Sequence, residues 1–77
     1  MANELMKYVE RVNAFGKIWG DKAYDLNSAT DRRRLAEKLE CDLSPENLTC
    51  DGELSRAEVN RRYTLYTRAL KQLEALA

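Results

Sequence analysis

The stretch that decides the fold is the last third of the chain, residues 55–76, which reads SRAEVNRRYTLYTRALKQLEAL. Ser55 and Glu58 have the spacing of a capping box, in which each side chain satisfies a backbone N–H at the start of a helix. The residues that follow are apolar at three- and four-residue steps, the period of an α-helix. We therefore predict one long helix over 56–76.

The apolar residues of this helix form two adjoining stripes. One stripe contains Val59, Tyr63, Tyr66, Leu70 and Leu73, and the other contains Leu65, Ala69 and Leu76. Together they span roughly 160° of arc, which is wider than contact with a single neighbouring helix requires. We expect this helix to pack against both other helices, or against one of them and a second chain.

Two further amphipathic helices are predicted earlier in the chain, over 3–19 and 30–40. The apolar stripe of the first, which we expect to be buried, comprises Leu5, Tyr8, Val9, Val12, Phe15, Gly16 and Trp19. Gly16 on this stripe would let another helix approach closely, and Gly20 is a helix stop. The helix over 30–40 carries its apolar residues, Leu35, Ala36 and Leu39, on one side.

The segment between the second and third long helices is irregular. Ser44, Pro45 and Glu46 are typical of a helix start, so we predict a short helical turn near 44–48. Asp51 and Gly52 indicate a turn. The predicted fold is a small all-α three-helix bundle that forms one domain over residues 1–77.

Composition excludes several classes of function. The chain has 13 Lys and Arg against 13 Asp and Glu, a balance that argues against a general polyanion binder. It has no histidine and only two cysteines, so we expect no His-based catalysis, no metal centre and no cofactor. We expect no membrane segment, and we expect a cytoplasmic protein with reduced thiols. An enzyme is the least expected class.

Residues 47–58, NLTCDGELSRAE, resemble the calcium loop of the EF-hand family. Gly52 occupies the sixth place of that loop and Glu58 the twelfth. The resemblance implies Asn47, Asp51, Ser55 and Glu58 as side-chain ligands. The first place is Asn instead of Asp, and the third is Thr49. We favour the alternative interpretation, in which an Asp-Gly turn is followed by a capped helix.

Several cations and aromatic residues are candidate partner-binding residues. Arg32, Arg33 and Arg34 lie in the first turn of a predicted helix, where cations oppose the helix dipole, so they could grip an acidic partner. Arg62 falls within an apolar arc, either as a covering side chain or as an interfacial arginine. Tyr66 is either a core residue or a binding anchor, like Tyr63 and Trp19.

These observations favour a non-enzymatic protein-interaction module. We expect an accessory or regulatory factor, of the kind found in bacteria and phages, that binds a protein partner or forms a homodimer. The alternative is nucleic-acid binding through the arginine-rich helices. Zero net charge disfavours that alternative, and so does a connection of about 14 residues where a helix-turn-helix needs three or four. A degenerate EF-hand-like calcium site ranks third.

Overall fold

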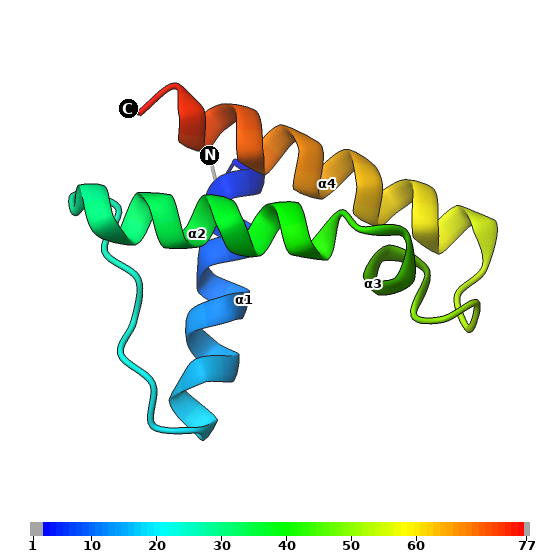
Figure 1. Ribbon diagram of the computed structural model, residues 1–77, viewed down its shortest axis with the longest axis horizontal. Helices are drawn as coiled ribbons and strands as arrows, with labels where there is room; N and C mark the ends of the chain where they lie inside the picture. The colour runs from blue at the N-terminus through cyan, green and yellow to red at the C-terminus, as the bar shows by residue number, and fades with distance from the viewer. Residues whose placement is uncertain (1–2, 77) are drawn as a thin grey trace.

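The computed structural model describes residues 3–76, and within that range the protein consists of four helices and no strand (Figure 1). They are α1 (Glu4–Ile18), α2 (Ala29–Asp42), α3 (Pro45–Thr49) and α4 (Arg56–Glu74). The predicted all-α bundle is confirmed, and α3 is the short helical turn predicted near 44–48.

The longest helix, α4, organises the fold. It contacts each of the other three helices. In Figure 1, α2 runs beside α4, whereas α1 runs steeply across both and continues away from them. Of the two arrangements that the wide apolar arc of α4 allowed, packing against both other long helices is therefore the one observed.

Each of the three long helices starts at a residue whose side chain caps its N-terminus. The side chains of Asn3 and Ser28 accept hydrogen bonds from the backbone N–H groups of Met6 and Asp31, at the starts of α1 and α2. Ser55 accepts from the Glu58 N–H, which is one half of the predicted capping box. The Glu58 carboxylate accepts instead from Arg61 Nη1, at 2.7 Å. Each cap satisfies an N–H that the helix itself leaves without a partner.

The core lies where α1 crosses α2 and α4. Its buried residues are Leu5, Tyr8, Val9, Leu35, Leu39, Leu48, Tyr66, Ala69 and Leu73. The rings of Tyr8 and Tyr66 meet edge to face, with their centroids 5.4 Å apart. The Tyr8 hydroxyl donates a hydrogen bond to the Asp42 carboxylate. Burial, together with this carboxylate, raises the pKa of Tyr8 well above its ordinary value.

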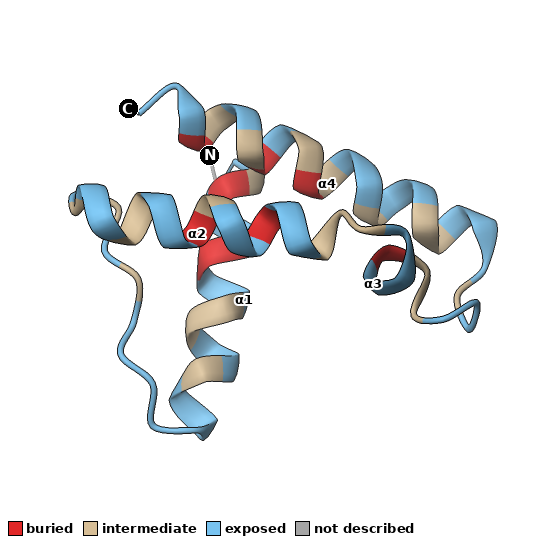
Figure 2. Ribbon diagram, viewed as in Figure 1, coloured by how far each residue is buried: buried red, intermediate tan, exposed pale blue. Residues whose placement is uncertain are grey.

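Only the first half of the α1 stripe is buried, so our prediction for the whole stripe is wrong. Leu5, Tyr8 and Val9 enter the core, but Phe15 and Trp19 are exposed (Figure 2). The physical reason is the packing geometry: α4 contacts the start of α1, where Gln72 bonds to Leu5 and Tyr66 packs on Tyr8, and beyond that point α1 projects from the bundle (Figure 1).

The end of α1 is closed by two backbone hydrogen bonds. Asp21 N–H donates to the Gly16 carbonyl (2.9 Å), and Gly20 N–H donates to the Lys17 carbonyl (3.2 Å). Gly20 has φ +77°, so it ends the helix as predicted. A Cβ added to Gly16 would lie 3.4 Å from the Asp21 Cβ. Gly16 therefore faces the chain that returns after α1. The prediction that it faces a second helix is wrong.

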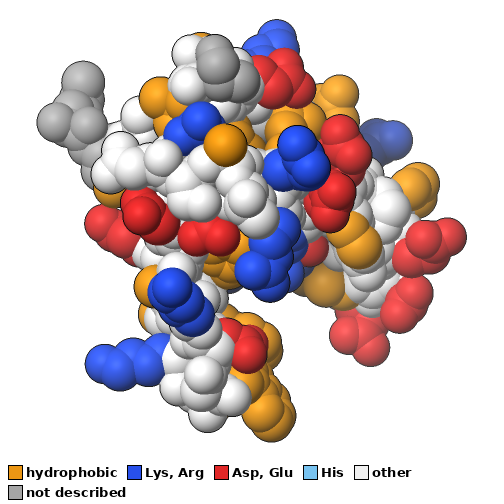
Figure 3. All heavy atoms as spheres, turned by 60° about the vertical axis from the view of Figure 1, so that its left-hand side comes forward, with side chains coloured by type: hydrophobic (Ala, Val, Ile, Leu, Met, Phe, Trp, Pro, Cys, Tyr) orange, Lys and Arg blue, Asp and Glu red, His pale blue; other side chains and the backbone are white. Residues whose placement is uncertain are grey.

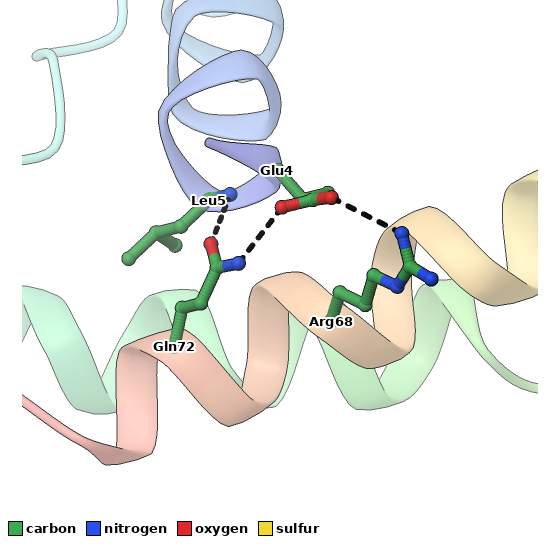
Figure 4. A network of polar contacts seen from close by, with 4 residues as sticks. All are labelled: Glu4, Leu5, Arg68 and Gln72. Atoms are coloured by element: carbon green, nitrogen blue, oxygen red, sulfur yellow. Dashed lines mark hydrogen bonds and ion pairs between the residues drawn. The ribbon is translucent and has the colours of Figure 1, made fainter. Parts of the chain in front are cut away.

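A polar network joins the start of α1 to α4 (Figure 4). Gln72 on α4 accepts from the Leu5 N–H at 2.9 Å and donates to the Glu4 carboxylate at 2.8 Å. Arg68 Nη1 lies 3.4 Å from the other Glu4 oxygen. The Gln72 hydrogen bond, followed by the backbone hydrogen bond at Glu4, lowers the pKa of the Glu4 carboxyl. A residue of α4 thus caps the N-terminus of α1.

Candidate functional site

Among residues 3–76, the most exposed apolar side chains lie at the end of α1. Phe15, Ile18 and Trp19, which we call the α1 tip, are 64%, 76% and 70% exposed. The rings of Phe15 and Trp19 lie close together, with centroids 6.4 Å apart. Figure 3 shows hydrophobic side chains gathered along one side of the end that projects from the body of the molecule. The α1 tip is therefore a candidate contact surface.

A cleft of about 360 Å³ opens beside the α1 tip. One wall is aromatic, from Phe15 and Trp19 on or next to α1 and Tyr24 on the connection to α2. A second part of the lining is the α2 face that carries Arg34 and Lys38. These two residues are one helical turn apart, so they share a face of the helix. The cleft thus combines flat apolar groups with cations.

Specific hydrogen bonds hold the connection that closes the cleft. Asn13 on α1 accepts from the Tyr24 N–H at 2.8 Å. Asp31 on α2 accepts from the Asp25 N–H at 2.9 Å, and Arg32 Nη1 donates to the Leu26 carbonyl at 2.8 Å. The connection is attached at both of its ends, so the position of the Tyr24 ring is set by the fold.

The cations of the cleft have no ion-pair partner within residues 3–76. Only two ion pairs form in that range, Arg61 with Glu58 and Arg68 with Glu4. The Arg34 guanidinium lies 5.9 Å from the centroid of the Tyr24 ring, within the range of a cation–π contact. The Asp31 carboxylate also lines the cleft, where it accepts the Asp25 N–H.

The structure separates the three consecutive arginines that we predicted as one partner-binding group. Arg32 is half-buried and bonded to the Leu26 carbonyl, so its role is to hold the connection. Arg34 lines the cleft. Arg33 is exposed, and the pair with Glu37 that its spacing favours does not form in the described structure.

The other two predicted residues lie away from the cleft. Arg62 is half-buried, and its Nη1 approaches Cys50 Sγ at 3.6 Å instead of pairing with Glu58. Tyr66 is 8% exposed and packs in the core, so its ring is not available to a partner. Of the two alternatives for Tyr66, the structure shows the core residue.

The segment that resembles an EF-hand loop is folded as a turn and a helix start. Asn47 lies within α3, where its Nδ2 donates to the Cys41 carbonyl at 2.9 Å. Thr49 Oγ1 donates to the Pro45 carbonyl at 2.7 Å. Asn47 and Thr49, at the first and third places of the supposed loop, therefore hydrogen-bond to nearby backbone carbonyls. Across residues 3–76, no three His, Cys, Asp or Glu side chains are grouped to hold a metal ion.

The two cysteines, Cys41 on α2 and Cys50 directly after α3, are free thiols. Cys41 is exposed, whereas Cys50 is half-buried and has the left-handed φ of 50°. Asp51 and Gly52 continue the left-handed backbone, with φ 56° and 87°. This run of positive φ reverses the chain between α3 and α4.

The α1 tip was not predicted as one surface, because Phe15 was placed in the core and Trp19 was left as either a core residue or a binding anchor. One signal in the sequence could have indicated it. Ile18 lies about 60° outside the apolar stripe, since successive residues turn by roughly 100° around a helix. A large aliphatic residue beyond the edge of the stripe indicates that the end of this helix is apolar on more than one side.

Within the described residues, no helix is long and apolar enough to cross a lipid bilayer. Comparison of the chain with protein-family models, with curated proteins and with solved structures returned no match.

Proposed function

We propose that this protein is a non-enzymatic protein-binding module whose contact surface is the α1 tip together with the adjoining cleft. The observation that carries the proposal is the exposure of Phe15, Ile18 and Trp19, between 64% and 76%, at one end of one helix. Contiguous apolar surface of this kind is typical of interaction sites, and Trp is enriched among residues that dominate binding energy. An accessory or regulatory role in a larger assembly fits such a module.

The size of the surface favours a different protein over a second copy as the partner. The exposed parts of the three side chains amount to an area on the order of 400 Å². A stable, standard-size interface buries about 800 Å² on each partner. A symmetric dimer through the α1 tip alone would therefore be too small, whereas a partner that also enters the cleft gains further contact area.

The test is a selection of binding peptides from a random library displayed on phage, with the purified protein as bait. We expect the selected peptides to bind the protein and to lose at least about tenfold in affinity for the Phe15→Ser, Trp19→Ser double variant. The matched control is Tyr63→Ser with Leu76→Ser, which removes two exposed apolar side chains elsewhere.

Two results of this selection would refute the proposal. One is recovery of no peptide above the background of an empty bait. The other is recovery of peptides that bind both double variants equally well. Sedimentation of the protein at micromolar concentration tests the homodimer separately, and a dimer that the Phe15→Ser, Trp19→Ser variant dissociates would replace the different partner by a second copy.

Nucleic-acid binding is the second candidate, and one feature favours it: aromatic side chains line the same cleft as Arg34 and Lys38. Aromatic rings beside cations are also how proteins bind single-stranded nucleic acids. The balance of 13 Lys and Arg against 13 Asp and Glu disfavours this candidate. A salt-dependent change in the anisotropy of a labelled oligonucleotide, absent in Arg34→Glu with Lys38→Glu, would support this candidate over protein binding.

A further inference from the structure

We infer that the cleft beside the α1 tip receives an acidic amphipathic helix of the partner, with apolar residues against the aromatic wall and carboxylates against Arg34 and Lys38. This inference rests on the proposed function, and it deepens that proposal by naming the chemistry of the partner segment. Two observations support it: the aromatic side chains that line the cleft, and the charged side chains beside them.

The aromatic side of the cleft favours an apolar side chain of the partner. Phe15 and Trp19 present adjacent rings that no described side chain of the protein covers, since both are more than half exposed. An inserted Leu or Phe side chain would bury its own surface and these rings together, at roughly 25 cal/mol per Å². Helices that bind grooves supply such anchors at three- and four-residue steps.

The cations on the α2 side of the cleft favour an occupant that carries negative charge. Arg34 and Lys38 repeat with the four-residue spacing of a helix and have no ion-pair partner among residues 3–76. Lys22 adds a third cation to the lining, against the two carboxylates Asp21 and Asp31. The Asp31 carboxylate accepts the Asp25 N–H and keeps its charge, so these three cations and two carboxylates give the lining a net charge of +1. Carboxylates of an occupant would thus supply the missing counter-charges, with Arg34 able to make a bidentate pair.

The acidic segment of the protein itself does not fit this role in a second copy. Residues 41–55 contain Asp42, Glu46, Asp51 and Glu53 and no Lys or Arg. However, Leu48, the apolar residue of α3, is buried in the core. In a second copy this segment would therefore bring carboxylates without the apolar anchor of α3, so the occupant belongs to a different protein.

The experiment measures binding of two fluorescein-labelled synthetic peptides by anisotropy. Both are about 14 residues, roughly four helical turns, with leucines at three- and four-residue steps. The remaining positions are Glu and Ala in the first peptide, and Lys and Ala in the second. We expect the Glu peptide to bind at least about tenfold more tightly than the Lys peptide at low salt.

The charge-reversal variant Arg34→Glu with Lys38→Glu tests which residues cause the preference. Both residues are exposed, so the fold is expected to be retained, and helical circular dichroism checks this. We expect the variant to prefer the Lys peptide. The control is Lys7→Glu with Arg11→Glu, which makes the same change in net charge on exposed α1 residues outside the cleft, and which we expect to keep the Glu preference.

The outcomes separate this inference from the proposed function. Equal binding of both peptides, lost in Phe15→Ser with Trp19→Ser, would overturn the acidic preference and leave the protein-binding surface in place. A Glu preference that the Lys7, Arg11 control also reverses would overturn the assignment to the cleft. No binding of the Glu peptide below about 1 mM would overturn the inference, while the library selection would still decide the proposed function. Displacement of the Glu peptide by a single-stranded oligonucleotide would favour nucleic acid as the ligand and also overturn it.

Discussion

Replacement of Gln72 by Ala should weaken the attachment of α1 to α4. Gln72 accepts the Leu5 N–H at 2.9 Å and donates to the Glu4 carboxylate at 2.8 Å (Figure 4). The substitution removes both bonds and leaves a backbone N–H at the start of α1 with no partner in the protein. Loss of a typical hydrogen bond costs about 1 kcal/mol, and an N–H that water cannot reach costs more.

A loss of about 1 kcal/mol is large relative to the free energy of unfolding of so small a protein. A core of this size supplies roughly 3–5 kcal/mol. For a domain of 60–100 residues, 1 kcal/mol corresponds to a Tm change of about 4–8 °C. We therefore expect Gln72→Ala to lower the Tm by about this amount in thermal unfolding followed by helical circular dichroism.

Lys71→Ala is the matched control for this prediction. Lys71 is the adjacent, exposed residue of α4, and Lys and Gln have similar helix propensities, so both substitutions gain the same few tenths of a kcal/mol from Ala. Equal Tm values for the two variants would refute the assignment of Gln72 as the cap of α1.

The pH dependence of the Tm provides a second test of the hydrogen bond between Gln72 and Glu4. The Glu4 pKa is lowered from its ordinary 4.5, chiefly by Gln72, so its contribution to stability is present above that value and is lost as the pH falls through the lowered pKa. The Tm difference between the protein and Gln72→Ala should therefore narrow in acid. A difference that widens as the pH falls would contradict this account.

Three further changes test the core and the turns. Leu39→Ala empties a fully buried position and should cost about 2–5 kcal/mol, leaving little folded protein at 37 °C by circular dichroism. Gly20→Ala places a Cβ at φ +77° and should lower stability by about 1 kcal/mol in urea unfolding, although no heavy atom lies within 4 Å of the new carbon. Tyr8 should stay un-ionised at pH 10.0, the ordinary pKa of a tyrosine, because burial and then Asp42 raise its pKa. Stability should accordingly fall as the pH rises above the ordinary value of 10.0, and less so in Tyr8→Phe.

The helices were predictable because their signals are local. Ser55 begins α4 and Gly20 ends α1 through bonds to residues no more than four positions away. The same locality explains the errors. Four-residue spacing favours pairs of Glu58 with Arg62 and of Arg33 with Glu37. In the structure Glu58 pairs with Arg61, and Arg62 approaches Cys50.

The candidate site was predictable only in part. Arg34 was among the residues singled out, because three cations in the first turn of a helix oppose its dipole. Trp19 was considered as a binding anchor, but Phe15 was placed in the core. Both residues continue the same stripe as Tyr8 and Val9, and periodicity cannot distinguish the buried part of a stripe from its exposed part.

The approximate extent of each helix and its apolar side follow from the sequence, because capping and periodicity are properties of neighbouring residues. How far the core extends along α1, and the hydrogen bond by which Gln72 caps a helix 67 residues away, depend on how the helices pack. Burial is set by where a distant segment arrives. Here α4 packs against the start of α1, and the far end of α1 is left exposed beside the cleft.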